Sequence, residues 1–425
     1  MTGGDAGAGL SIGLVGCGGM GHRHLRAYGA LRRVGASRFA VAAVCDPRVA
    51  AAEHAADLAE ELLGARPAVF SDFEQLIASG AVAALDVVTD PRAHHLIAVP
   101  ALESGLHVIC EKPLGLTVRA CRLMVDAAAR SGAVLATAEN YRRDSPNRLA
   151  RAVLDRGLLG EIHLMTEMHV GGDDGVIVSP WRHLRESGSI SLDMGVHFAD
   201  VFLYLLGELD HVDGMSFIAE PFRVLDPDAP AVTGIEEVSP GVIRATGDDS
   251  LVALYRTAAG VPIQLSYIPS GPGRQWTQRT LHGRNGSMSV PPDRSGGSLV
   301  VHLGSRTLAG AELRSELGGF ELDGVTAAFF GSDGTEYDLA FPEVDAATIG
   351  IELDDFAGAV LDGRAPEVDG RDGLHAVAAV WAIAESFERG GSVRIADVAD
   401  STLSAAQDPL DVDLGLLPVA GGLRP

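Results

Sequence analysis

Lys112 is the only lysine in this sequence, and the remaining 32 of its 33 lysine and arginine residues are arginines. Arginine keeps its proton in proteins, whereas a lysine ammonium can lose its proton when it is buried or crowded by charge. A chain that otherwise uses only arginine has kept one lysine, which indicates a position where the proton or the compact point charge matters. We therefore interpret Lys112 as a residue that takes part in the chemistry of a functional site. The alternative is a chance survivor on a loop.

Asp193 and His197 form a second candidate for proton chemistry, in the stretch Asp-Met-Gly-Val-His. Residues four apart lie on the same face of a helix. A carboxylate that holds one imidazole nitrogen fixes the tautomer, which leaves the other nitrogen to accept a proton. The alternative is an Asp–His pair that supports only the fold. Gly195 favours the functional interpretation, because a glycine inside a helix costs about 1 kcal/mol relative to alanine and indicates that something packs closely there.

Residues 16–21 (Gly-Cys-Gly-Gly-Met-Gly) match the glycine pattern that binds a dinucleotide when a strand precedes it and a helix follows. Asp46 follows the next predicted strand, 25 residues after Gly21. A carboxylate there accepts from the ribose hydroxyls of NAD and repels a 2′-phosphate. The alternative is that Asp46 caps the following helix. We predict NAD as the cofactor, with NADP as the second choice because Arg48 is nearby.

The elements that position these residues alternate regularly up to residue 138. Strands are predicted at 10–15, 39–45, 69–70, 84–89, 106–110 and 133–138, and helices start near residues 19, 47, 72, 94 and 117. This alternation predicts right-handed crossovers and a doubly wound parallel sheet, in which ligands bind outside the carboxyl ends of the strands. Lys112 follows one of these strand ends, so it is expected at the cofactor edge.

The pattern changes after residue 139. We predict helices at 146–157, 190–206, 350–361 and 370–389, and strands at 161–170, 212–219, 250–257, 261–268, 276–281 and 286–290. Short turns between neighbouring strands predict a large, open, mainly antiparallel sheet in an α+β domain. Residues 291–345 are rich in Gly and Asp, and the sequence does not order their elements. The predicted division is a flexible tail (1–9), a Rossmann domain (10–139) and an α+β substrate-binding and oligomerisation domain (140–425).

Composition restricts the classes of partner. A formal net charge of −24 argues against nucleic acid and anionic membranes, which require basic faces. The four cysteines lack CxxC spacing and are typical of reduced, buried thiols in a cytoplasmic protein. The N-terminal residues do not resemble a secretory signal, and the histidines show no metal-binding geometry.

Several motifs together resemble the glucose–fructose oxidoreductase/inositol dehydrogenase/rhizopine catabolism (Gfo/Idh/MocA) family of oxidoreductases. The matching stretches are residues 16–21, Thr89-Asp-Pro-Arg-Ala-His94, residues 101–108 leading into Glu111-Lys112-Pro113, Glu139-Asn-Tyr-Arg142 and Asp193-x-Gly195-x-His197. Asp90 departs from the usual proline, and residues 187–189 (Ser-Gly-Ser) replace a glycine run.

The resemblance implies roles for particular residues. Lys112, His197 and Asp193 would be catalytic: Lys112 would hydrogen-bond the reacting hydroxyl and the nicotinamide ribose, His197 would exchange the hydroxyl proton, and Asp193 would orient His197 or contact substrate. The implied cofactor-binding residues are Gly16, Gly18, Gly19, Met20, Gly21, Asp46, Thr89, His94, Glu111, Lys112 and Asn140. The expected substrate-binding residues are Tyr141, Trp181 and Arg182, although Trp181 could equally be a surface aromatic packed on its own loop.

The implied function is hydride transfer between NAD(P) and a secondary carbinol or ketone of a sugar, cyclitol or sugar derivative. The resemblance also implies a homo-oligomer formed through the sheet of the second domain. One alternative is a redox-neutral glycosidase or lyase that works by transient oxidation and elimination. Another is a cofactor-sensing regulator without catalysis, against which Lys112, Asp193 and His197 all count.

Overall fold

The computed structural model describes residues 9–227, 235–322 and 324–418. The predicted flexible tail lies, apart from Gly9, outside the described residues. The described chain forms two compact units. The first comprises residues up to Gly115 together with Cys121–Ser145 and Glu321–Gly373, and the second comprises Leu116–Ala120, Pro146–Phe320 and the residues from Leu374 onward. Residues 321–373, which the sequence division places in the second domain, are thus part of the first compact unit.

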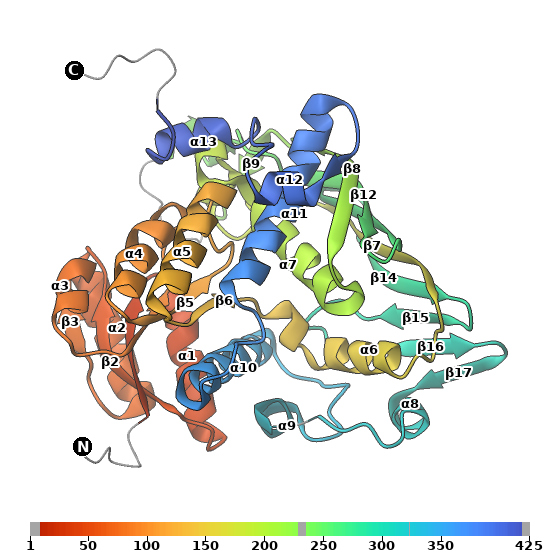
Figure 1. The fold of residues 1–425 in the computed structure, drawn as a ribbon, viewed down its shortest axis with the longest axis horizontal. Helices are drawn as coiled ribbons and strands as arrows, with labels where there is room; N and C mark the ends of the chain where they lie inside the picture. Colours follow the sequence, from red (N-terminus) through yellow and green to blue (C-terminus); the bar gives the residue numbers. More distant parts are fainter. Residues whose placement is uncertain (1–8, 228–234, 323, 419–425) are drawn as a thin grey trace. The chain divides into compact units, whose positions relative to one another are not determined.

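The first unit is built on a six-stranded parallel sheet in the order β3-β2-β1-β4-β5-β6 (Figure 1). The strands are β1 (Leu10–Val15), β2 (Phe39–Cys45), β3 (Ala68–Phe70), β4 (Ala84–Val87), β5 (His107–Glu111) and β6 (Leu135–Ala138). The chain order reverses between β1 and β4, so the predicted doubly wound parallel sheet is confirmed. Ligands of such sheets bind at this reversal.

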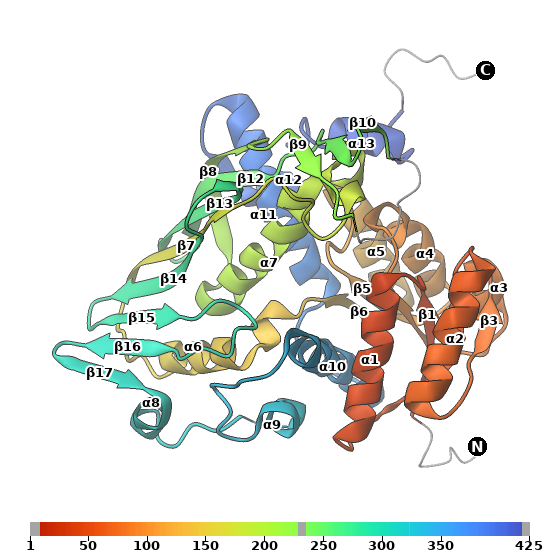
Figure 2. The same ribbon diagram turned by 180° about the vertical axis from the view of Figure 1, so that it is seen from behind.

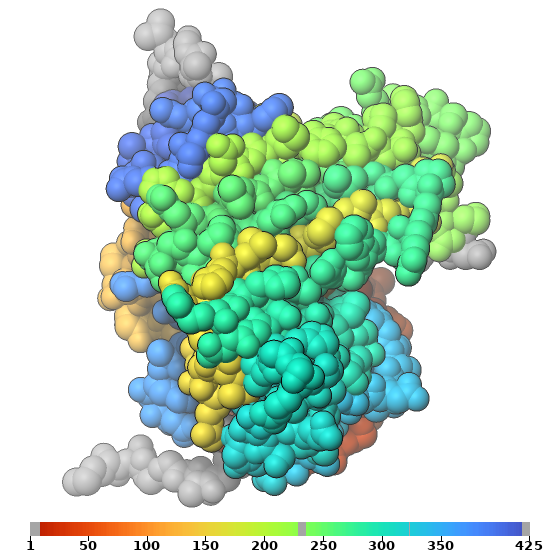
Figure 3. Space-filling view, turned by 90° about the vertical axis from the view of Figure 1, so that its right-hand side faces the viewer, coloured from red at the N-terminus to blue at the C-terminus, as the bar shows by residue number. Residues whose placement is uncertain are grey.

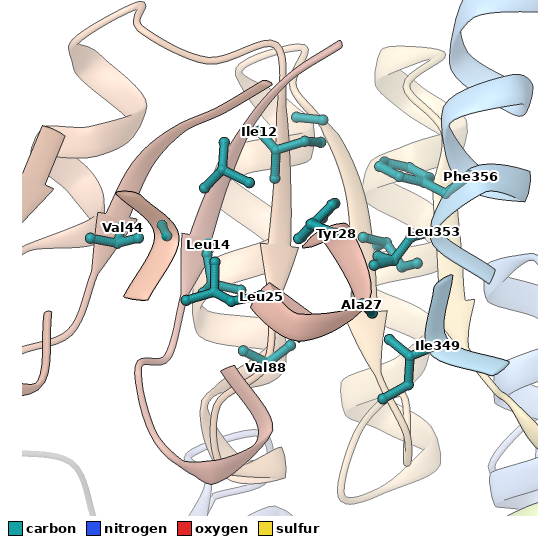
Figure 4. Close-up of a cluster of buried hydrophobic side chains, with 14 of the residues drawn as sticks. Ile12, Leu14, Leu25, Ala27, Tyr28, Val44, Val88, Ile349, Leu353 and Phe356 are labelled. Atoms are coloured by element: carbon teal, nitrogen blue, oxygen red, sulfur yellow. The ribbon is translucent and has the colours of Figure 1, made fainter. Parts of the chain in front are cut away.

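Helices connect these strands: α1 (Gly19–Arg33), α2 (Val49–Leu63), α3 (Phe73–Ala78), α4 (Pro91–Glu103) and α5 (Val118–Ser131). A 3-10 turn η1 (Tyr141–Arg143) follows β6, and α9 (Gly324–Phe330) and α10 (Phe341–Asp362) join the unit from the C-terminal half of the chain. Figure 4 shows Ile349, Leu353 and Phe356 of α10 facing the cluster that contains Tyr28 of α1. These apolar side chains explain why α10 belongs to the first unit.

The second unit is built on a nine-stranded mixed sheet in the order β17-β16-β15-β14-β7-β13-β12-β8-β18. The strands are β7 (Ile162–Gly172), β8 (Leu209–Phe217), β12 (Ser250–Thr257), β13 (Pro262–Pro272), β14 (Trp276–Gly283), β15 (Ser287–Val290), β16 (Val300–Leu303), β17 (Arg306–Ala309) and β18 (Val393–Arg394). Figure 3 looks onto these strands, with β7 in yellow between green neighbours. The pairing of β7 with β13 is parallel and the other pairings of neighbouring strands are antiparallel, so the expectation of a mainly antiparallel sheet is confirmed.

The remaining elements of the second unit are α6 (Ser145–Asp155), the 3-10 turns η2 (Pro180–His183) and η3 (Arg185–Ser187), α7 (Ser189–Leu206), α8 (Gly310–Glu316), α11 (Gly370–Arg389), α12 (Ile395–Ala399) and α13 (Asp408–Asp413). A small sheet contains β9 (Phe222–Val224), β10 (Glu237–Ser239) and β11 (Val242–Arg244). Helices α7 and α11 lie along one face of the large sheet (Figures 1 and 2).

One stretch of the described chain, Arg185–Leu206, is long and apolar enough to cross a membrane, and 72% of its most apolar window is buried. It contains α7, whose Gly195 packs against Val380 of α11 and Leu251 of β12. Burial against its own unit explains the apolar character of this helix, as in the core of a globular protein.

Candidate active site

The glycine turn between β1 and α1 has the shape that a pyrophosphate requires. Gly16 has φ +106°, and a Cβ on it would lie 2.7 Å from the Val88 carbonyl oxygen. A Cβ on Gly21 would lie 2.1 Å from the Gly16 oxygen, so only glycine allows this close approach of helix and strand. Cβ atoms on Gly18 and Gly19 would meet nothing within 4 Å. The turn therefore leaves open space at the N-terminus of a 15-residue helix, where backbone N–H groups favour an anion.

Asp46 follows β2, and its carboxylate connects the turn after β1 with the turn after β2. One oxygen accepts from the Cys17 N–H at 2.9 Å, and the other accepts from the Arg48 N–H at 2.9 Å. Burial alone would raise the pKa of Asp46, but hydrogen bonds from Arg48 and Cys17 lower it. Helix α2 begins at Val49 with Arg48 as its N-cap, so Asp46 does not cap that helix. The exposed Arg48 guanidinium also pairs with the carboxylate, at 3.2 and 3.3 Å.

His94 connects the loops after β4 and β5. Its Nε2 lies 3.1 Å from the Thr89 carbonyl oxygen, and its Nδ1 lies 3.1 Å from the Pro113 oxygen and 3.3 Å from the Leu114 oxygen. The ring is fully buried on α4, whose N-cap is the unexpected Asp90, accepting from the Arg92 N–H. His94 thus holds the segment that directly follows Lys112.

Glu111 and His24 fix the backbone at Lys112 through hydrogen bonds. The Lys112 N–H donates to one oxygen of Glu111 at 2.9 Å, and the other oxygen lies 3.1 Å from Nε2 of His24. Nδ1 of His24 lies 2.9 Å from Asp86, which also accepts from the Tyr28 hydroxyl at 3.0 Å.

This buried set is ionic. Burial alone would lower the pKa of His24, but Asp86 and Glu111 raise it well above its usual range. Burial alone would raise the pKa of Glu111, and His24 lowers it. A charged imidazole between two carboxylates therefore fixes the end of β5, where Lys112 begins.

The structure places the sequence-predicted cofactor residues of the first unit at one edge of one sheet. They follow β1, β2, β4, β5 and β6, and parallel strands end at the same edge. Within that group, the carboxylate of Glu111 and the ring of His94 form the internal contacts described above. Tyr141 and Asn140 lie in and just before η1, and both are buried.

In the second unit, Asp193 lies on α7 and pairs with Arg182 of η2. Nε of Arg182 lies 3.1 Å from Oδ1 of Asp193. The same guanidinium lies over the Trp181 ring at 4.2 Å and donates to the Ser179 hydroxyl at 2.7 Å. The structure thus connects the predicted substrate-binding pair, Trp181 and Arg182, with the predicted catalytic residue Asp193.

His197 also lies on α7 and is 6% exposed. A Cβ on Gly195 would lie 2.9 Å from Cγ2 of Val380 and 3.1 Å from Cδ1 of Leu251. The expectation that something packs closely at Gly195 is therefore confirmed. Next to His197, Phe198 stacks on His169 of β7 with ring centroids 4.9 Å apart.

The loop that carries Trp181 and Arg182 depends on a buried ion pair that sequence reasoning missed. Nη2 of Arg223 lies 2.6 Å from Asp249, and both side chains are fully buried. Arg223 also donates to the Asp173 and Gly175 carbonyl oxygens at 3.2 Å. Burial lowers the pKa of His183 to about 4, so its neutral Nε2 accepts from the Ile177 N–H at 2.9 Å. A buried arginine in a short strand gives no periodic signal in a sequence.

A second missed set lies on the large sheet. Arg279 of β14 contacts Glu167 of β7 at 2.6 Å and Asp293 at 2.8 Å, and also Asn147 at 3.0 Å. His169 lies 2.6 Å from Glu167. Arg279 and Glu167 are 112 positions apart in the chain, and the strand pairing of β7 with β14 brings them together.

Family models match both halves of the chain. Residues 10–139 match the model described as "Oxidoreductase family, NAD-binding Rossmann fold", and residues 147–289 match the "GFO/IDH/MocA C-terminal domain". The chain belongs to the Gfo/Idh/MocA oxidoreductase family. It is therefore an NAD-dependent oxidoreductase.

Individual members of this family resemble the chain over different lengths. Levoglucosan dehydrogenase of Pseudarthrobacter phenanthrenivorans is 27% identical over 408 residues, which cover 92% of this chain and 99% of that protein. Inositol 2-dehydrogenase 2 of Saccharopolyspora erythraea is 30% identical over 239 residues, or 53% of this chain and 66% of that protein. The crystal structure of an NAD binding oxidoreductase from Klebsiella pneumoniae superposes with a TM-score of 0.74 at 25% identity, covering 91% of this chain and 99% of that one.

The residues of this Gfo/Idh/MocA member fit the cofactor of the family. The open turn at Gly18 and Gly19 would hold the pyrophosphate, and Asp46 would hold the adenosine ribose if the Arg48 side chain turns aside. Lys112 and Asn140 stand at the ends of neighbouring strands β5 and β6, toward the same edge. When bound, the nicotinamide accepts or returns a hydride.

Proposed function

We propose that this protein is an NAD-dependent dehydrogenase or reductase that acts on a secondary CH–OH group of a sugar, cyclitol or sugar derivative. The observation that carries the proposal is the single lysine at the carboxyl end of β5, on the same sheet edge as the dinucleotide turn. The names of levoglucosan dehydrogenase and inositol 2-dehydrogenase 2 support the substrate class.

The residues divide the work on the substrate. Lys112 hydrogen-bonds the reacting hydroxyl and offsets the negative charge that develops on its oxygen. His197 takes the hydroxyl proton during oxidation and returns it during reduction. Asp193 fixes the imidazole of His197, and Arg182 holds Asp193 through their ion pair. Trp181 and Tyr141 complete the substrate contacts.

The test is an activity screen with the purified full-length protein. Incubation with NAD and a panel of sugars, cyclitols and nucleotide sugars should produce nicotinamide absorbance with at least one polyol, and Lys112→Arg should abolish most of it. A protein that converts a glycoside while producing no net NADH would instead be a redox-neutral glycosidase or lyase. Absence of turnover with every class, together with tight NAD binding, would favour a cofactor-sensing regulator.

We also propose a homo-oligomer formed through the large sheet. Leu254, Met215 and Trp276 are 54%, 44% and 54% exposed. Residues that pair across strands, and residues two apart along a strand, lie on the same face of a sheet. One such row of paired residues runs from Met215 through Val252, Ser266 and Met168 to Gln278. Leu254 lies two residues from Val252 and Trp276 lies two residues from Gln278, so all three exposed residues share one face. Apolar residues gathered on one face are typical of an interface. Light scattering should show a dimer or tetramer, and Leu254→Asp should shift it toward monomer.

A cytoplasmic location is likewise a proposal. The four cysteines, all among the described residues, are buried and outside any disulfide, and burial raises the pKa of Cys17 and Cys45 to about 12. Such thiols suit a reducing compartment. Fractionation of the source cells would test the location.

A further inference from the structure

Glu139 is a buried carboxyl that the proposed function does not use. It directly follows β6 and is 2% exposed. One of its oxygens accepts from the Tyr141 N–H at 3.1 Å, at the start of η1. An uncharged glutamine could accept that hydrogen bond without the cost of burying a charge. A carboxyl at this position therefore needs a second reason.

The register of the sheet shows what Glu139 faces. Strands β5 and β6 run parallel, and Glu111 pairs with Ala138 at their ends. The residue that follows β5 is Lys112, and the residue that follows β6 is Glu139. Adjacent strands are about 5 Å apart, so the stem of the lysine and the buried carboxyl leave the sheet side by side.

The charges around Glu139 come from three elements. Burial raises the pKa of Glu139 to about 7, and the negative charge of Glu111 contributes to this increase. The hydrogen bond from the Tyr141 N–H and the positive charges of Lys112 and Arg142 lower the pKa and so offset part of the increase. From α10, Glu352 is also buried, and burial together with Glu111 raises its pKa well above the usual range. One oxygen of Glu352 has no hydrogen-bond partner among the described residues, which favours the protonated form of this carboxyl. Glu139 is thus the member of the cluster that exchanges its proton near neutral pH.

We propose that Glu139 is the proton acceptor that serves Lys112, so that the substrate proton can leave through the first unit as well as through His197. This inference rests on the proposed function. In oxidation, an N–H bond of the Lys112 ammonium breaks and an O–H bond forms on the Glu139 carboxylate. The neutral amine then takes the hydroxyl proton of the substrate as the hydride leaves the carbon for NAD⁺, which is reduced while the alcohol is oxidised. Glu139 finally releases its proton to solvent. Because it acts through Lys112, Glu139 is a positioning residue.

The first test needs no substrate. Infrared titration of the full-length protein should show a buried carboxyl that ionises near neutral pH and a second that stays protonated. Glu139→Gln should remove the first signal, and Glu352→Gln should remove only the second. Lys112→Gln should move the Glu139 midpoint to higher pH, because the lysine charge stabilises the carboxylate. A midpoint that is the same with and without Lys112 would overturn the proposal.

The second test is kinetic. Wild-type oxidation should accelerate as pH rises through about 7, where Glu139 ionises. Glu139→Gln should lose this limb of the profile and reduce kcat on the order of 100-fold with little change in KM. Glu352→Gln, the matched control for loss of a buried carboxyl, should keep the limb. A Glu139→Gln variant with the wild-type pH profile would contradict the proposal even where the dehydrogenase activity itself is established. If no polyol is oxidised, the proposed function fails, and the infrared midpoint in Lys112→Gln still decides whether the two side chains are coupled.

Discussion

The two units hold their candidate catalytic residues by different physical means. In the first, Lys112 begins where Glu111, His24 and Asp86 form a buried chain of charge-assisted hydrogen bonds. In the second, Asp193 pairs with Arg182, but α7, the helix that carries Asp193 and His197, is itself held by side-chain packing at Gly195.

The difference determines how each region should respond to pH and to mutation. Buried charges interact strongly because little water screens them. Removal of one charged partner should therefore lower the free energy of unfolding by a large amount that depends on the protonation state of the group. Packing is short-ranged and indifferent to pH, so a change at Gly195 should cost less and cost the same at every pH.

His24→Leu should have the largest effect, because it leaves Asp86 and Glu111 buried without their cation. We expect unfolding free energy to fall by about 3–5 kcal/mol. The folded-state pKa of His24 lies above its unfolded value, so its contribution is fully present below about pH 6.5 and is lost as pH rises through the folded pKa. Denaturant titrations should show a smaller difference in unfolding free energy between the wild type and His24→Leu at pH 9 than at pH 6. Tyr28→Phe, which removes one hydrogen bond to Asp86, is the control and should cost about 1 kcal/mol.

Lys112→Arg should reduce turnover by at least about 100-fold, or roughly 2.7 kcal/mol, while NAD affinity changes little. Arginine keeps the charge but not the mobile proton. Steady-state kinetics with the substrate found in the screen and fluorescence titration with NADH would measure both quantities. A near-normal kcat would disprove the proposed role of Lys112.

Gly195→Ala should destabilise the second unit by up to about 2 kcal/mol. The new methyl group meets Val380 and Leu251, which costs about 1–3 kcal/mol, and the better helix propensity of alanine offsets about 1 kcal/mol. The double variant Gly195→Ala/Val380→Ala should recover part of the loss in thermal denaturation. A loss that varies strongly between pH 6 and pH 9 would break the contrast between the two units.

Asp46→Ser should have the smallest effect, about 1 kcal/mol or roughly a fivefold shift of the NADP-to-NAD affinity ratio toward NADP. The carboxylate repels a 2′-phosphate, and Arg48, released from its pair with Asp46, would attract one. Parallel titrations with both cofactors measure the ratio, and Arg48→Ala in the same background should reverse the shift. An unchanged ratio would show that Asp46 does not select the cofactor.

Much of the first unit could be predicted because its signals are local. The glycine spacing at 16–21 is typical of the tight turn between a strand and a helix that binds a dinucleotide. The apolar runs that end before Asp46, Thr89 and Lys112 are typical of buried parallel strands. Strands β1 and β2 have the predicted bounds. For Lys112, composition alone was sufficient to select the residue.

The rest depended on contacts between distant segments. In residues 291–345 the structure forms β16, β17, α8 and α9 and begins α10, whose weak local patterns had no predictable order. The pairing of Arg182 with Asp193 and the buried pair of Arg223 with Asp249 join residues 11 and 26 positions apart across irregular loops. No periodicity encodes such contacts.

The sequence by itself determined the dinucleotide turn, the parallel sheet and the three catalytic candidates, because each depends on residue type and short spacing. Only the tertiary structure decided that α10 joins the first unit, that His24 and Asp86 stand behind Glu111, and that Glu139 leaves the sheet beside Lys112. The physical reason is burial: the charge state and role of an ionisable side chain depend on which other segments exclude water from it.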